Sequence, residues 1–190
     1  MMKKTMIAAV AVLAMSGAMA AGEYVTFGGG RVESTATGNK TIAGSVAVGK
    51  SLEGYLGGLT GELRALATRD QAAQVGNAVE ARVTYALPTV WGAKTWVRGT
   101  LGEAFGSGYN YGYWAVEPGF TYAFTPAFSA EASVKRELSF DRGLAADSTT
   151  YTAGVNYALT KSNIVSGKAY RSQAGSNFLT GYTVELTHTF

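Results

Sequence analysis

Residues 44–51 read Gly-Ser-Val-Ala-Val-Gly-Lys-Ser, which matches the phosphate-loop pattern of nucleotide-binding proteins. That loop holds phosphates only when a helix follows it, because amide groups at the helix N-terminus complete the cradle. Residues 52–59 read Leu-Glu-Gly-Tyr-Leu-Gly-Gly-Leu, and a segment so rich in glycine does not begin a helix. We therefore interpret residues 49–51 as a turn and expect no nucleotide cofactor.

The only histidine, His188, also invites a catalytic interpretation. A serine hydrolase needs a histidine beside a serine and an acid. His188 is close to the C-terminus, on the same alternating phase as Leu186 and Phe190, so we interpret it as an anchor at a membrane interface. The lack of cysteine excludes a thiolate zinc site and a cysteine nucleophile. We expect no enzymatic activity, no cofactor and no metal.

Any functional side chains must be positioned by β-strands, because apolar and polar residues alternate along most of the chain. The alternation is clearest in residues 79–87, 151–159 and 182–190, and no convincing helical pattern follows Ala20. Aromatic residues make up 12% of the chain and charged residues 15%, a composition that argues against disorder.

A short phrase recurs at Tyr85-Ala-Leu-Pro, Tyr122-Ala-Phe-Thr-Pro and Tyr157-Ala-Leu-Thr-Lys. Each copy ends one strand and precedes a turn, so a repeat of about 36 residues holds two strands. Five repeats predict an all-β fold, an antiparallel up-and-down barrel of about ten strands, with eight or twelve as alternatives. Longer loops are expected to alternate with short turns. The expected strands are 24–33, 41–49, 55–67, 78–87, 94–105, 113–124, 127–138, 150–159, 164–171 and 179–190.

The first twenty residues have the features of a secretory signal peptide. A basic start is followed by an apolar run from Ile7 to Met15 and by an Ala-x-Ala ending at Ala20. The apolar run is too short to span a bilayer as a helix. We therefore predict a signal peptide at residues 1–20 and a barrel domain at 21–190. Removing Lys3 and Lys4 leaves little net positive charge, so nucleic acid is not an expected partner.

The apolar face of the barrel could point inward, as in a secreted soluble β-protein, or outward toward lipid. Two features favour lipid. Full charges occupy mid-strand positions on the polar face, and aromatic residues collect near the strand ends, where a membrane meets water. These aromatics are Tyr85, Trp91, Trp96, Tyr122, Phe124, Phe128, Tyr157 and Phe190 toward one end, and Phe105, Tyr109, Tyr111, Tyr113, Trp114, Phe140, Tyr151 and Phe178 toward the other. The sequence therefore predicts a transmembrane barrel.

The segments Val155-Asn-Tyr-Ala-Leu-Thr-Lys-Ser-Asn163 and His188-Thr-Phe190 resemble the last hairpins of general diffusion porins of Gram-negative outer membranes. The resemblance implies an outer-membrane location, contact with membrane lipid and lipopolysaccharide, and recognition of the last strand by the barrel-assembly machinery. The signature positions are Tyr182, Val184, Leu186, His188 and Phe190. The chain differs from those porins in having about half their length and no acidic loop that would narrow the lumen.

With the apolar face outward, the polar face lines the lumen. The loop 68–77 joins the expected strands 55–67 and 78–87. If this loop is centred near residue 72, Arg64 lies opposite Glu80 and Glu62 lies opposite Arg82. A turn centred on Pro126 likewise sets Glu117 opposite Lys135. A basic neighbour for each carboxylate argues against a paired-carboxylate acid–base site. The residues expected in the lumen are Glu62, Arg64, Glu80, Arg82, Arg98, Glu117, Glu131, Lys135 and Glu185.

These charges allow two interpretations. They could form a salt-bridge network across the lumen, since a buried charge needs a partner, or they could line a wet channel. Ten strands leave a narrow interior. We expect a small porin-like channel for passive diffusion of ions or small solutes. The alternative is a sealed structural barrel that contributes to envelope integrity or surface adhesion.

Overall fold

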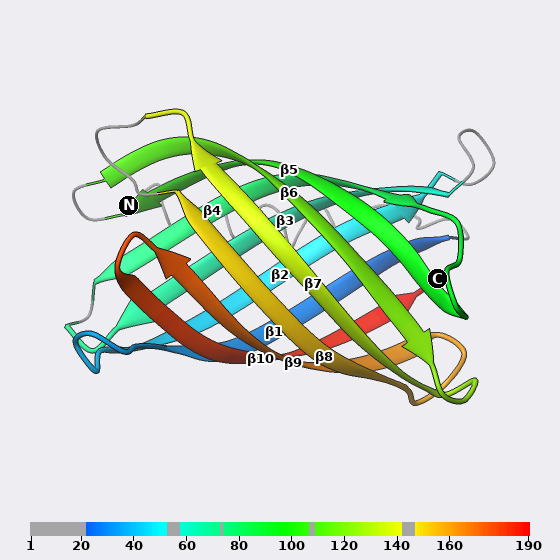
Figure 1. Cartoon of the computed structure of the whole chain (residues 1–190). Helices are drawn as coiled ribbons and strands as arrows, with labels where there is room; N and C mark the ends of the chain where they lie inside the picture. The colour runs from blue at the N-terminus through cyan, green and yellow to red at the C-terminus, as the bar shows by residue number, and fades with distance from the viewer. Residues whose placement is uncertain (1–21, 53–57, 73, 107–108, 142–146) are drawn as a thin grey trace.

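The computed structural model describes residues 22–190 except 53–57, 73, 107–108 and 142–146. In this part of the chain ten antiparallel strands pair in sequence order, and β1 pairs with β10 to close a barrel, as predicted (Figure 1). The predicted signal peptide lies outside the described residues. The strands are β1 Glu23–Ser34, β2 Lys40–Ser51, β3 Leu59–Asp70, β4 Val75–Ala86, β5 Ala93–Gly106, β6 Tyr109–Ala123, β7 Phe128–Ser139, β8 Ser148–Ala158, β9 Asn163–Ala174 and β10 Asn177–Thr189.

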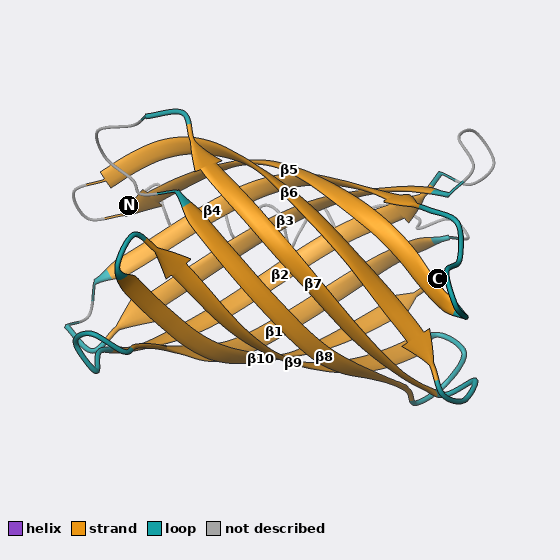
Figure 2. Ribbon diagram, in the orientation of Figure 1, coloured by secondary structure: helices purple, strands orange, loops and turns teal. Residues whose placement is uncertain are grey.

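The alternation of side chains places apolar residues outside and polar residues inside. Leu63 and Val184 on the outer face are 56% and 54% exposed, whereas Glu80 and Glu185 on the inner face are 3% and 7% exposed. Together the ten strands form one continuous wall (Figure 2). A barrel of this polarity is suited to an apolar surrounding medium, because its outer face would be poorly solvated by water. No helix in the described part of the chain is long and apolar enough to cross a membrane.

The barrel has two distinct ends. The terminal end, at the right of Figure 1, carries the start of β1, the end of β10 and the connections 87–92, 124–127 and 159–162. The far end is formed by the ends of β1, β3, β5, β7 and β9 and by the starts of the strands that follow them. We predicted longer loops at this end of the barrel. That prediction is wrong for most of them, because as few as two residues separate consecutive strands there. The strands extend beyond the alternating pattern because backbone ladder hydrogen bonds do not depend on side-chain polarity.

One local interpretation also needs correction. Residues 49–51, which resembled a phosphate-loop turn, continue strand β2, and the Ser51 amide donates to the Gly22 carbonyl at 3.0 Å. Pro118 interrupts the β6–β7 ladder because it has no amide hydrogen. The pairing resumes in the same register on both sides, with Val116 opposite Arg136 and Gly119 opposite Ser133, so the interruption is not a bulge.

Most predicted interfacial aromatics point outward near a barrel end, for example Phe124 and Tyr151. Trp96, Tyr109, Tyr111 and Tyr113 were predicted to join these belts, but their strand phase turns them to the inner face instead. Trp96 and Tyr111 line the central cavity, and Tyr113 donates a hydrogen bond to Glu80. Their strand phase decides their direction, because alternate residues of a strand must point to opposite faces.

Candidate functional site: the charged lumen

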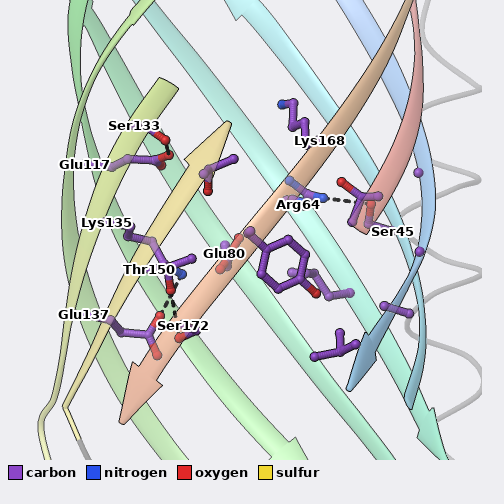
Figure 3. A pocket seen from close by; sticks show the side chains of 18 of the residues that line it. Ser45, Arg64, Glu80, Glu117, Ser133, Lys135, Glu137, Thr150, Lys168 and Ser172 are labelled. Atoms are coloured by element: carbon purple, nitrogen blue, oxygen red, sulfur yellow. Dashed lines mark hydrogen bonds and ion pairs between the residues drawn. The ribbon is translucent and has the colours of Figure 1, made fainter. Parts of the chain in front are cut away.

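A cavity of about 510 Å³ lies inside the barrel and is the candidate functional site (Figure 3). Its lining holds equal numbers of basic and acidic side chains, together with hydroxyl groups such as those of Thr150 and Ser172. The charges come from seven strands and form three networks and one separate pair, Lys135 with Glu137. The charged lining residues are Arg64, Arg82, Arg98, Lys135, Lys168, Glu80, Glu117, Glu131, Glu137 and Glu185.

The first network joins β3 to β7 through β10 and β9. Arg64 Nη2 lies 2.9 Å from Glu185 Oε1 and donates to Ser45 Oγ at 2.9 Å. The other oxygen of Glu185 lies 3.0 Å from Lys168 Nζ. Lys168 Nζ also lies 3.2 Å from Glu131 Oε1. Four charged groups are thereby connected in alternating sign, the arrangement that partly buried charges require.

The second network surrounds the guanidinium of Arg82. Arg82 Nη1 lies 3.3 Å from Glu62 Oε1, and its Nη2 pairs with Glu80 Oε2. Each carboxylate receives a further hydrogen bond from a tyrosine hydroxyl. Tyr24 donates to Glu62 at 2.9 Å, and Tyr113 donates to Glu80 at 2.6 Å. Two carboxylates thus share one cation and two phenol donors, which offsets part of the cost of their burial.

The third network connects β4 to β7. Arg98 Nη1 lies 3.3 Å from Glu117 Oε2, and Arg98 Nε donates to Thr84 Oγ1 at 3.0 Å. The second oxygen of Glu117 accepts from Ser133 Oγ at 2.6 Å. The Arg98 guanidinium also stacks 4.9 Å from the centre of the Trp96 ring, a cation–π contact that holds both side chains in place.

In three places a contact skips one strand because the residue between the two partners is glycine. Tyr24 reaches Glu62 over Gly49, Tyr113 reaches Glu80 over Gly102, and Lys168 reaches Glu131 over Gly154. In each case the partners and the glycine are opposite one another in the ladder. A larger residue would fill the gap: a Cβ at position 102 would lie 2.5 Å from Tyr113 Cζ. These glycines let long side chains lie along the inner wall.

Asn156 Nδ2 on β8 donates to Glu131 Oε2 at 3.2 Å, so all ten strands contribute at least one side chain to these contacts, which together we call the polar belt. Its members are Tyr24, Ser45, Glu62, Arg64, Glu80, Arg82, Thr84, Arg98, Tyr113, Glu117, Glu131, Ser133, Asn156, Lys168 and Glu185. The cavity extends from this belt toward the far end, where Val32 and Ala174 line it. Tyr24, Thr84 and Asn156, which lie nearer the terminal end, are not part of its lining.

The predicted register is confirmed, but some predicted partners are wrong. Glu62 lies opposite Arg82 and pairs with it, as expected. Arg64 lies opposite Glu80, yet its ion pair is with Glu185, because Arg82 already occupies the Glu80 carboxylate.

The predicted Glu117–Lys135 pair is also replaced. Glu117 pairs with Arg98, which lies directly opposite it on β5, whereas Lys135 pairs with Glu137 at 2.8 Å on its own strand. The register on either side of Pro118 still sets Glu117 level with Lys135, as predicted, but the two oxygens of Glu117 are occupied by Arg98 and Ser133. Lys168 and Glu137 were missed, although both share the strand phase of lumen residues.

The positions of the predicted C-terminal signature lie on the outer face of β10, except that Phe190 directly follows the strand. Tyr182, Val184, Leu186 and Phe190 are exposed. His188 Nδ1 lies 2.9 Å from Asn163 Oδ1, and its ring packs edge-to-face against Phe190 with the centres 4.6 Å apart. Within the described residues, no group of three or more histidine or acidic side chains is arranged to hold a metal ion.

No protein-family model and no curated protein matches the sequence. The translocator domain of the autotransporter NalP from Neisseria meningitidis matches with a TM-score of 0.53 at 9% identity, over 100% of this chain and 95% of that one. The β domain of the Bordetella autotransporter Brka gives 0.56 at 12% identity, over 90% and 100%. The KdgM porin, in complex with disordered oligogalacturonate, gives 0.51 at 10% identity, over 88% and 99%. The chain therefore has the fold of outer-membrane β-barrels.

Proposed function

We propose that the protein is a small porin-like channel of the outer membrane, through which ions or small solutes diffuse passively. The observation that carries the proposal is the cavity of about 510 Å³, which stays open because the charged side chains lie along the wall. Five basic and five acidic groups line it. Such a balance favours weak selectivity between cations and anions, since neither sign of ion meets a net opposite charge.

The location and partners are parts of the same proposal. The outward apolar face supports residence in a membrane. The exposed side chains of β10 support recognition of that strand by the barrel-assembly machinery. The far-end connections are short, which weighs against a surface adhesin built from long loops. We propose no enzymatic activity.

A sealed structural barrel is the second candidate, because the lining of the cavity stops at the polar belt. The measurement that separates the two is single-channel current across a planar bilayer. Protein refolded in detergent is first shown to be folded by its heat-dependent shift in gel mobility. Reproducible small steps support the channel. A silent bilayer from folded protein contradicts the channel and favours the sealed barrel.

The same bilayer measurement tests whether the charge of Arg98 affects ion selectivity. Arg98→Ala removes one positive charge from the cavity lining, so the preference for cations should increase. Arg136→Ala is the matched control, because Arg136 is on the outer face and half exposed. An equal change in both variants would contradict conduction past Arg98.

A further inference from the structure

Four basic residues gather on the outer face at the far end of β9, β1, β2 and β3. Register fixes their direction: Arg31 and Arg69 both lie opposite Ile42, which is 70% exposed on the outer face. Lys40 lies two residues before Ile42 on the same phase. Arg171 lies opposite the exposed outer residue Tyr151. We call Arg31, Lys40, Arg69 and Arg171 the basic patch.

The basic patch carries more positive charge than its neighbours neutralise. Its only acidic contact within the described residues is Glu33, whose Oε2 lies 3.9 Å from Arg31 Nη2. Both side chains of that pair are more than 40% exposed, so the pair is weak and easily exchanged. Arg171 instead stacks on the Phe178 ring, with its guanidinium carbon 4.5 Å from the ring centre. Lys40 lies opposite the same Glu33 in the β1–β2 ladder, and Arg69 forms no ion pair with the described residues.

The spacing of the patch suits a phosphate group. Arg31 and Arg69 are two strands apart, or roughly 9–10 Å. Only the apolar side chain of Ile42 stands between them. Two arginine side chains can close around one phosphate at this separation, and arginine binds phosphate through paired hydrogen bonds.

The surface below the patch, toward the terminal end, is apolar. Phe27 on β1, Leu63 on β3 and Val184 on β10 are each about half exposed on the same outer face. A charged row above an exposed apolar strip matches a lipid in its two parts. Phosphate would meet the arginines, and acyl chains would lie along the apolar strip.

We propose that the basic patch binds the phosphate-bearing headgroup of a membrane glycolipid of the lipopolysaccharide class. The inference rests on the outer-membrane location proposed above and places the far end in the outer leaflet. A lipopolysaccharide headgroup carries several phosphates, which match the several cations of the basic patch. Phosphatidylglycerol carries only one phosphate.

The test measures the midpoint of thermal unfolding of refolded protein in neutral detergent, read by gel mobility. Purified lipopolysaccharide, dephosphorylated lipopolysaccharide, phosphatidylglycerol and inorganic phosphate are added separately. Lipopolysaccharide should raise the midpoint by roughly 5 °C or more at a hundredfold excess over its Kd. The other three additives should have much smaller effects. An equal rise with phosphatidylglycerol or inorganic phosphate would overturn the assignment to a glycolipid.

Variants locate the effect. Arg31→Ser with Arg69→Ser should abolish most of the rise. Lys94→Ser with Lys161→Ser is the matched control, because both lysines are exposed near the terminal end and the charge change is the same. The single variant Arg69→Gln serves if the double variant does not fold. A full rise in the patch variants, or an equal loss in the control, would overturn the proposal. Single-channel current is recorded from the same preparation. Channel activity there would show that the proposed function still stands even if the lipid-binding proposal fails.

Discussion

Lys168 on β9 and Glu131 on β7 form an ion pair across β8, with Nζ and Oε1 3.2 Å apart. Gly154 lies opposite both residues in the ladder, and its missing side chain leaves the space that the pair fills. Lys168 also pairs with Glu185. A single glycine therefore determines whether the charges of three strands remain connected.

The first prediction concerns this glycine. In Gly154→Ala the new Cβ would lie 2.9 Å from Lys168 Cγ and 3.0 Å from the Gly167 carbonyl oxygen, so the lysine must move. We expect a loss of about 1–3 kcal/mol in the free energy of unfolding, as for other overpacked sites. Urea unfolding of the refolded barrel measures it. Gly167→Ala is the control, because the nearest atom to its new Cβ lies at 4.0 Å. Equal losses in both variants would contradict the role of Gly154.

The second prediction concerns Arg82, which stands between Glu62 and Glu80. Arg82→Ala leaves two mostly buried carboxylates without their cation. Breaking a buried ion pair from one side costs about 3–5 kcal/mol, so the melting midpoint should fall markedly. Arg136→Ala breaks an exposed pair with Asp147, where a loss of about 0–1 kcal/mol is expected. An unchanged midpoint in Arg82→Ala would mean that the pair contributes nothing to stability.

A matched variant separates the charge of Arg82 from its volume. Arg82→Met keeps much of the side-chain volume but removes the charge, so it should destabilise the barrel almost as much as Arg82→Ala. Adding Glu62→Gln and Glu80→Gln removes the orphaned charges and should recover most of the loss. No recovery in the triple variant would indicate that packing, rather than charge, makes Arg82 important.

How far the sequence predicts this site depends on the kind of contact. The pairing of Glu62 with Arg82 follows from adjacent strands and the centre of one connection, so it was predictable. Contacts that skip a strand were not, because they depend on a glycine in the strand between and on the curvature of the wall. Lys168 was missed because the small residues Ser166 and Gly167 before it obscure the alternation.

Two aromatic residues, Tyr113 and Trp96, were predicted at the membrane interface but face the lumen. Tyr113 has the same strand phase as Glu117, and Trp96 has the same phase as Arg98, so phase alone places both inside the lumen. Their aromatic character suggested the membrane interface instead. Where phase and residue type disagree in a strand, phase decides, because the pleat leaves the side chain no other direction.

The third prediction concerns the hydroxyl of Tyr113. Tyr113→Phe removes the 2.6 Å hydrogen bond to Glu80 but keeps the ring that packs over Gly102. A hydrogen bond to a charged group contributes about 1.5–3 kcal/mol, and that much stability should be lost in urea unfolding. Tyr151→Phe, on the exposed outer face, should change stability by much less. If the two variants lose equal amounts, the Tyr113 bond is not specifically stabilising.

The fourth prediction separates assembly in cells from stability. The Phe190 ring is half exposed and contacts His188, and its backbone amide donates to the Glu23 carbonyl at 3.0 Å. Phe190→Ala keeps that amide bond and the ladder of β10. Refolding in detergent should therefore be nearly unchanged, whereas the amount of folded protein in the outer membrane should fall severalfold if the assembly machinery reads this position. Phe124→Ala, at the same end and similarly exposed, should not reduce the folded amount in cells. A loss of refolding in vitro by Phe190→Ala would instead assign the residue to barrel closure, because β1 and β10 meet there.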